Sequence, residues 1–181
     1  VCSSDLLKPE TKMMAMVKAY SYGLGGYEIA EFLQHHHIDY LGVAYADEGV
    51  DLRKNGITTP IMVMNPEQHS YNSIIDYNLE PEIYSFRVLD LFNEQLLHKG
   101  TQRKYPIHIK LETGMHRLGF KADELTELKQ KLNTMNVEVK SIFSHLSSAD
   151  DENEKDYTMD QILTFSRNSE KLMEGLQYRP M

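Results

Sequence analysis

Cysteine is almost absent from this sequence, which has one, Cys2, among 181 residues. A single cysteine excludes an internal disulfide framework and a cysteine-rich metal site. No apolar stretch approaches the roughly 20 residues that cross a bilayer. The first residues also lack the charged start and apolar core of a signal peptide. We therefore expect a cytoplasmic protein that does not enter a membrane.

Positive charge is scarce as well. The chain has 19 Lys and Arg residues against 27 Asp and Glu residues, which gives a net charge of −8. Without a lysine-rich run, we expect no nucleic-acid partner. The glycine-rich stretch 22–26, YGLGG, lacks both the dinucleotide-binding spacing and the Gly-Lys-Ser/Thr of a phosphate loop. The acidic run 150–156, DDENEKD, is typical of a solvated loop.

The two ends of the chain look unlike the rest. Residues 1–6, VCSSDL, have no periodic pattern, and a common sequencing-adapter sequence translates to the same six residues. We expect this segment, with Cys2, to be non-native. The other end stops where a new apolar segment begins. We therefore interpret residues 7–181 as part of one larger domain.

Short apolar segments alternate with amphipathic ones along the whole chain. Apolar runs predict strands at 12–19, 40–46, 61–64, 82–86, 107–112 and 137–143. Helical spacing predicts helices at 27–36, 47–54, 68–77, 88–98, 122–132 and 158–176. Asp47 is the expected N-cap of the second helix. Strand and helix repeated about six times indicate right-handed βαβ units and a parallel sheet.

Polar residues within the strands favour a closed barrel over an open sheet. Lys110 and His108 alternate with apolar residues in 107–112 and should point inward. A parallel sheet covered on both faces would read as continuous Val, Ile and Leu. The predicted fold class is α/β, an incomplete (β/α)8 TIM-like barrel with about six of its eight units.

Four candidate functional residues follow strand ends. Lys18 ends the first predicted strand, in KMMAMVKAYSYGLG. Lys110 lies near the end of the fifth predicted strand, and Arg117 follows in the next loop. His145 follows the sixth predicted strand. In a βα barrel these ends converge on one mouth, where a partly desolvated lysine can act as a nucleophile. With Tyr22 beside them, these groups suit an anionic, phosphorylated cofactor that carries an aldehyde.

Each of these residues also has a purely structural interpretation. A strand-end lysine is usually a solvated charge. Arg117 could pair with Glu112, Lys110 with an interior carboxylate, and His145 could be a core histidine. The run His35–His37 invites a metal interpretation, but adjacent helical residues do not face each other. We expect it to mark a helix C-terminus and expect no metal site.

Three motifs, in order, resemble the N-terminal barrel domain of the alanine racemase family, enzymes of the third fold type that use pyridoxal 5′-phosphate (PLP). MAMVKAYSYGLGG resembles the PLP-attachment motif, IHIKLETGMHRLGF the motif around the active-site arginine, and FSHLSSADD the histidine segment. YLGVAYADEGVDLRKNGITTPIMVM resembles the intervening strands. The resemblance covers the chain from about residue 7 onward.

The resemblance implies a role for each candidate residue. Lys18 is the catalytic, Schiff-base lysine, and Tyr22 binds the cofactor phosphate. Lys110 is the lysine that is often carbamylated, and it orients Arg117 toward the cofactor's phenolic oxygen and the substrate carboxylate. His145 lies beside the pyridine ring. One departure is His116, which stands where many family members have glycine.

The implied activity is interconversion of L- and D-alanine for peptidoglycan synthesis by a homodimeric protein. The remaining barrel strands, the C-terminal β-domain and the second catalytic base would lie beyond this sequence, so we expect the chain alone to be inactive. The sequence also resembles versions fused behind a peptidoglycan precursor ligase. Two alternatives stay open: a PLP-binding barrel without turnover, of the kind linked to PLP homeostasis, and another PLP barrel enzyme such as a serine racemase or an amino-acid decarboxylase.

Overall fold

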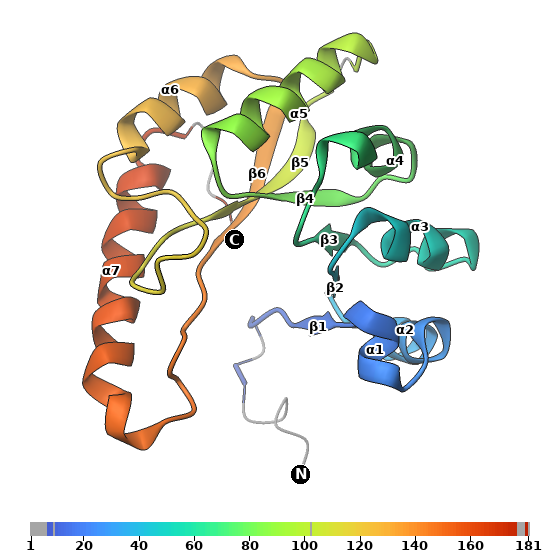
Figure 1. The fold of residues 1–181 in the computed structure, drawn as a ribbon, viewed down its shortest axis with the longest axis horizontal. Coiled ribbons are helices and arrows are strands. Elements are labelled where there is room, and N and C mark those ends of the chain that lie inside the picture. The colour runs from blue at the N-terminus through green and yellow to red at the C-terminus, as the bar shows by residue number, and fades with distance from the viewer. Residues whose placement is uncertain (1–6, 9, 102, 177–179, 181) are drawn as a thin grey trace.

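The computed structural model describes residues 7–8, 10–101, 103–176 and 180. In this part of the chain, six strands form one parallel sheet in the order β1-β2-β3-β4-β5-β6 (Figure 1). The strands are β1 (Met14–Met16), β2 (Tyr40–Val43), β3 (Ile61–Val63), β4 (Glu80–Ile83), β5 (Tyr105–Lys110) and β6 (Val137–Phe143). The helices are α1 (Lys18–Gly23), α2 (Gly26–His35), α3 (Ala46–Lys54), η2 (Gln68–Ser70), α4 (Tyr71–Asp76), α5 (Phe86–His98), α6 (Leu125–Thr134), η3 (Glu152–Glu154) and α7 (Lys155–Met173).

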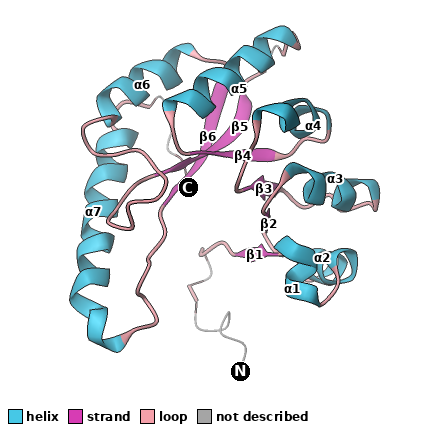
Figure 2. Cartoon of the chain, in the orientation of Figure 1, coloured by secondary structure: helices cyan, strands magenta, loops and turns pink. Residues whose placement is uncertain are grey.

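The strand order identifies the architecture. A doubly wound sheet reverses its strand order at a switch point, whereas this sheet runs in chain order throughout. Right-handed crossovers then place every connecting helix on the same face. Figure 2 shows the helices in an arc outside the strands. This arrangement confirms the predicted parallel α/β fold, with six strands of a barrel wall.

The predicted elements are all present, and their ends differ in places. The first strand ends at Met16 rather than at residue 19, because the chain turns into α1 at Lys18. The fourth strand is Glu80–Ile83 instead of 82–86. Ser85 is extended and accepts a hydrogen bond from the amide of Val88, at 3.4 Å, and so starts α5 directly after the strand. The segment 1–6 lies outside the described residues.

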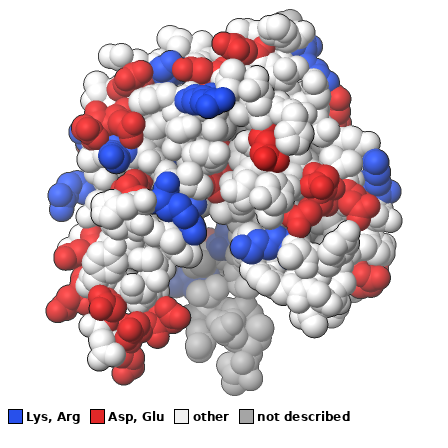
Figure 3. All heavy atoms as spheres, viewed as in Figure 1, with Lys and Arg blue, Asp and Glu red and all other residues white. Residues whose placement is uncertain are grey.

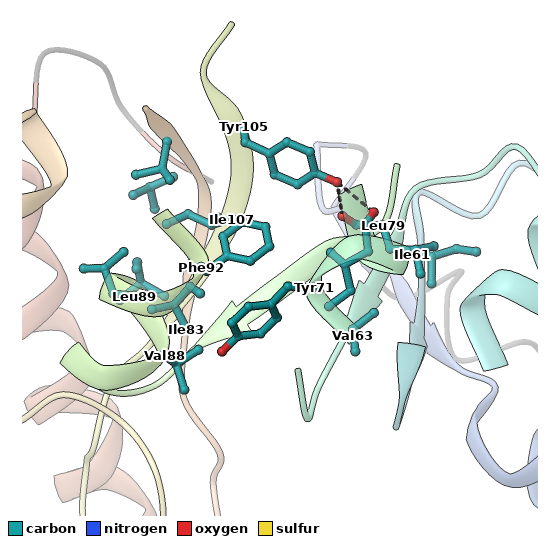
Figure 4. Packing of buried hydrophobic residues seen from close by; sticks show 14 of the residues in the cluster. Ile61, Val63, Tyr71, Leu79, Ile83, Val88, Leu89, Phe92, Tyr105 and Ile107 are labelled. Atoms are coloured by element: carbon teal, nitrogen blue, oxygen red, sulfur yellow. Dashed lines mark hydrogen bonds between the residues drawn. The ribbon is translucent and has the colours of Figure 1, made fainter. Parts of the chain in front are cut away.

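The main core lies between the sheet and its helices (Figure 4). Phe92 of α5 packs edge-on against Tyr71 of α4 and Tyr105 of β5, with ring centroids 5.3 and 5.4 Å apart. Such aromatic pairs add about 1 kcal/mol each beyond their buried area. The Tyr105 hydroxyl donates to the carbonyls of Ile74 and Leu79, at 2.9 and 2.8 Å. Burying this aromatic ring therefore leaves no polar atom of its side chain unsatisfied.

Polar side chains of β4 and β5 lie on the inner face of the sheet. His108 is buried, and its Nε2 lies 2.8 Å from Glu80 Oε2 while its Nδ1 lies 2.7 Å from Ser141 Oγ. Tyr40 donates to the same Glu80 oxygen at 3.2 Å. Lys110 is also buried, one alternation further along β5. The inward direction predicted for both residues is confirmed.

The outer surface is acidic in places. On the face in Figure 3, Asp and Glu side chains gather over the start of α7, where the run 150–156 lies. Lys and Arg side chains are scattered elsewhere on that face. Within the described residues, none of the helices combines the length and the apolar character needed to cross a bilayer.

Candidate functional site

A cavity of about 690 Å³ lies at the carboxyl ends of the strands. Its volume falls within the range of small-molecule and cofactor sites. The five residues singled out by sequence line it together: Lys18, Tyr22, Lys110, Arg117 and His145. The predicted convergence of these strand ends on one mouth is therefore confirmed. The roles of the five residues remain predictions.

Lys18 enters the cavity from an unusual turn. The next four residues, 19–22, all have left-handed backbone angles, with φ between 50 and 57°. Each such residue costs roughly 1–2 kcal/mol when it is not glycine, so the surrounding structure must hold the turn in place. The turn places Lys18, half-buried, with its Nζ 5.9 Å from the centre of the Tyr22 ring.

Glu48 of α3 supplies part of that support. Its Oε1 accepts from the amide of Ala19 at 2.8 Å, and its Oε2 accepts from the amides of Ala44 and Tyr45 at 2.6 and 3.2 Å. One carboxylate thus ties the Lys18 turn to the loop between β2 and α3. The predicted N-cap of this helix, Asp47, is wrong. The helix begins at Ala46 after Tyr45, and Asp47 is not its N-cap, because Glu48 satisfies the loop amides.

Lys110 and Glu82 form an ion pair on neighbouring strands at the floor of the cavity. Lys110 Nζ lies 3.1 Å from Glu82 Oε1, with side chains 7% and 0% exposed. The ammonium approaches outside hydrogen-bonding angles, and within the described residues neither Glu82 oxygen has another donor. Burial raises the pKa of the Glu82 carboxyl, and the charges of Lys110 and Arg117 oppose the rise. The site therefore holds a buried acid that is paired with Lys110 and lies within the electrostatic field of Arg117.

Arg117 is presented by a closed loop after β5. Phe120 donates to the Lys110 carbonyl at 2.9 Å, and Glu112 donates back to Phe120 at 3.0 Å. Gly119 makes this closure possible: its φ is 126°, and a Cβ there would lie 2.6 Å from the backbone of Leu111. The loop leaves Arg117 exposed at the rim.

The backbone conformation of His116 accounts for the glycine that many family members have at this position. Its φ is 56°, in the left-handed region where glycine is free of strain. Its ring is exposed, with Nδ1 4.0 Å from Glu112 Oε1. The residue therefore shapes the loop backbone, and it is not among the residues that line the cavity.

His145 lies in the loop after β6, next to the Arg117 loop, and lines the same cavity. Gln161 of α7 is buried and fixes that loop: its Nε2 donates to the His145 carbonyl at 3.3 Å, and its Oε1 accepts from the Ser147 amide at 3.1 Å. The imidazole itself is exposed. It is thus available to a ligand in the cavity.

The histidine run is elsewhere. α2 ends at His35, His36 is the C-cap, and His37 has a φ of 58°. All three are exposed. Within the described residues, no group of three or more His, Cys, Asp or Glu side chains is placed to hold a metal ion.

The cavity fits an anionic cofactor that carries an aldehyde. Lys18 offers an amine for attachment, and Lys110 and Arg117 offer positive charge. The apolar remainder of the wall includes Met62 and Phe143, which can contact a flat ring. These features match PLP, with its phosphate, its aromatic ring and its aldehyde.

Sequence reasoning missed three residues that shape this site: Glu48, Glu82 and Gln161. Glu82 could have been found, because Glu80 and Glu82 alternate with apolar or proline residues in LEPEI as inward residues of a strand would. Glu48 and Gln161 lie on helices among other polar residues, and only their long-range contacts distinguish them.

Comparisons with known proteins agree with this geometry. The sequence profile of the family "Alanine racemase, N-terminal domain" matches residues 3–181. The alanine racemase of Clostridium kluyveri is 34% identical over 166 residues, which cover 90% of this chain and 42% of that protein. The alanine racemase of Thermodesulfovibrio yellowstonii is 33% identical over 170 residues, which cover 94% of this chain and 45% of that protein.

Solved structures give the same result. Alanine racemase of Clostridium difficile 630 superposes with a TM-score of 0.88 at 30% identity, covering 94% of this chain and 45% of that one. Its complex with cycloserine superposes equally well. The chain thus spans less than half the length of these relatives. On its sequence, its strand order and its cavity, the chain belongs to the alanine racemase N-terminal domain family.

Proposed function

We propose that this chain forms the cofactor-binding half of a PLP-dependent alanine racemase, which interconverts L- and D-alanine for peptidoglycan synthesis. The observation that carries the proposal is the meeting of Lys18, Tyr22, Lys110, Arg117 and His145 in one cavity. We further propose that the protein acts in the cytoplasm as a homodimer. The remaining barrel strands, a C-terminal β-domain and a second base would complete the site, so that residues 7–181 alone do not turn over alanine.

Racemisation requires that a proton leave one face of the α-carbon and return on the other. PLP, when bound, supplies an aldehyde and an electron sink for the negative charge that develops on that carbon. Lys18 would hold the cofactor and, once released from it, take or return the α-proton at its Nζ on one face. The left-handed turn fixes the direction from which this amine approaches.

The other residues orient the ligands. Tyr22, in the same turn as Lys18, would donate its hydroxyl to the cofactor phosphate. Arg117 would bind the substrate carboxylate from the rim, since a guanidinium suits a planar anion. His145 would lie against the pyridine ring, in the loop fixed by Gln161. Lys110 would lie behind Arg117 and help to position it.

The test uses the full-length protein with PLP, borohydride reduction and peptide mapping, together with an assay of D-alanine formed from L-alanine. We expect the reduced cofactor on Lys18 only, and both the adduct and the activity to be lost in Lys18→Ala. Lys12→Ala is the matched control, because Lys12 is exposed just before the same strand. An adduct elsewhere, or full activity of Lys18→Ala, would refute the assignment.

A further inference from the structure

Glu82 is a buried acid in the site with no role assigned so far. Its side chain is completely buried, and it lines the same cavity as Lys110 and Arg117. The strand register holds it there: Glu82 of β4 pairs with His108 of β5, and Lys110 follows two residues later on the same inner face. The closeness of acid and lysine is therefore fixed by the sheet and not by a movable loop.

We propose that Glu82 supplies the negative charge that positions Lys110 and Arg117, so that Lys110 stays an unmodified ammonium group. The inference rests on the proposed function and deepens it. The family resemblance predicts instead that Lys110 is carbamylated, which would place the negative charge on the lysine itself. Glu82 offers another source of the same charge.

The chemistry of carbamylation explains why the two arrangements compete. A neutral Lys110 Nζ would attack the carbon of carbon dioxide, one C=O electron pair would move to oxygen, and nitrogen would lose a proton to leave N–COO⁻. The Glu82 carboxylate lies 3.1 Å from Nζ and forms its ion pair with the ammonium form of Lys110, and an ammonium group has no lone pair with which to attack. Glu82 therefore protects Lys110 from the reaction.

The charge of the product also opposes the reaction. With Lys110 unmodified, the trio of Glu82, Lys110 and Arg117 has one net positive charge. Carbamylation would leave two neighbouring anions facing a single arginine, at a position where burial keeps water from screening their repulsion. A net positive trio suits a cavity that is to hold a phosphate and a substrate carboxylate.

The deciding experiment detects the carbamate directly in the full-length protein. The protein is equilibrated with ¹³C-bicarbonate, and carbamate carbon is followed by NMR in wild type, Glu82→Gln and Glu82→Gln/Lys110→Arg. We expect no Lys110-dependent carbamate in wild type, a carbamate resonance in Glu82→Gln, and its loss in the double variant. Glu138→Gln is the control, because it removes the same charge from a partly exposed pair with Lys140; we expect it to behave as wild type.

Kinetics give a second readout. In buffer free of carbon dioxide, Glu82→Gln should lose at least about tenfold in kcat/KM, as expected when a charged partner is removed, and bicarbonate should restore most of the loss. Wild type should not respond to bicarbonate. A Lys110-dependent carbamate in wild type would overturn the proposal, and so would unchanged kinetics in folded Glu82→Gln. The NMR result stands whether or not the protein racemises alanine, so failure of the proposed function is seen separately.

Discussion

Two acid–base pairs lie on the same two strands, β4 and β5, and they differ in how well they are satisfied. In the lower pair, Glu80 accepts from Tyr40 and contacts His108, which in turn reaches Ser141. In the upper pair, Glu82 meets Lys110 at 3.1 Å, but neither of its oxygens has a well-oriented hydrogen bond within the described residues. A satisfied buried network stabilises a fold, whereas an unsatisfied one marks a place where function is maintained at some cost.

The difference between the two pairs separates residues that stabilise the barrel interior from residues that belong to the cavity. Two residues further along β5, the amine of Lys110 stands in place of the imidazole of His108, and the strand has reached the cavity wall. The lower pair has no place among the residues that line the cavity. We therefore expect substitutions in the lower pair to change folding, and those in the upper pair to change both stability and ligand binding.

Lys110→Met should give the largest effect on stability. It leaves Glu82 completely buried without its nearest cation, and breaking a buried pair costs about 3 kcal/mol or more. We expect that loss in the free energy of unfolding at pH 8, measured with urea on the full-length protein, and a smaller loss as the pH is lowered and protonation removes the charge of Glu82. Lys140→Met, in a partly exposed pair, should cost less than about 1 kcal/mol. Equal losses in the two variants would contradict the distinction.

His108→Leu tests the lower pair and should cost somewhat less. Glu80 would lose its partner at 2.8 Å but keep the hydrogen bond from Tyr40, and its side chain is 13% exposed. We expect a decrease of about 2 kcal/mol in the free energy of unfolding. PLP affinity per folded molecule should stay unchanged. Weaker PLP binding in the folded variant would show that the lower pair belongs to the site.

A pH series sharpens the comparison further. Because burial raises the pKa of Glu82 above its ordinary value of 4.5, there is a range of pH just above 4.5 in which the folded protein still holds this proton and the unfolded chain has already released it. This contribution to stability is present at low pH and is lost as the pH rises through the raised value. In urea titrations in buffer free of carbon dioxide, wild type should lose stability relative to Glu82→Gln as the pH rises above 4.5. If the difference in stability between wild type and Glu82→Gln did not change with pH above 4.5, the pKa of Glu82 would not be raised.

Tyr40→Phe should have the smallest effect. Burial, followed by the charge of Glu80, raises the pKa of the Tyr40 hydroxyl, so it remains a neutral donor at physiological pH. Removing this donor deletes one bond of 3.2 Å while His108 still satisfies the same oxygen. We expect a loss of about 1 kcal/mol in the free energy of unfolding. A loss as large as that of His108→Leu would mean that the lower network acts as one unit.

The fold and the positions of the candidate site residues could be predicted from the sequence, because both depend on the local spacing of apolar and polar residues. Strand and helix periodicity gave the parallel order, and strand-end positions brought Lys18, Lys110 and His145 to one mouth. The sequence did not predict Glu48, whose partner Ala19 lies 29 residues earlier, or Glu82, which looked like one end of a strand. Contacts between elements depend on register and packing, and no local pattern specifies them.

The left-handed turn after Lys18 has a consequence for how the protein is made. Residues 19–22 have no local preference for these angles, and the carboxylate that accepts from Ala19 belongs to α3. Lys18 is therefore not oriented when its own segment leaves the ribosome. Its orientation forms only after β2 and α3 have been synthesised and docked, so the segment that contains Lys18 cannot acquire this geometry by itself.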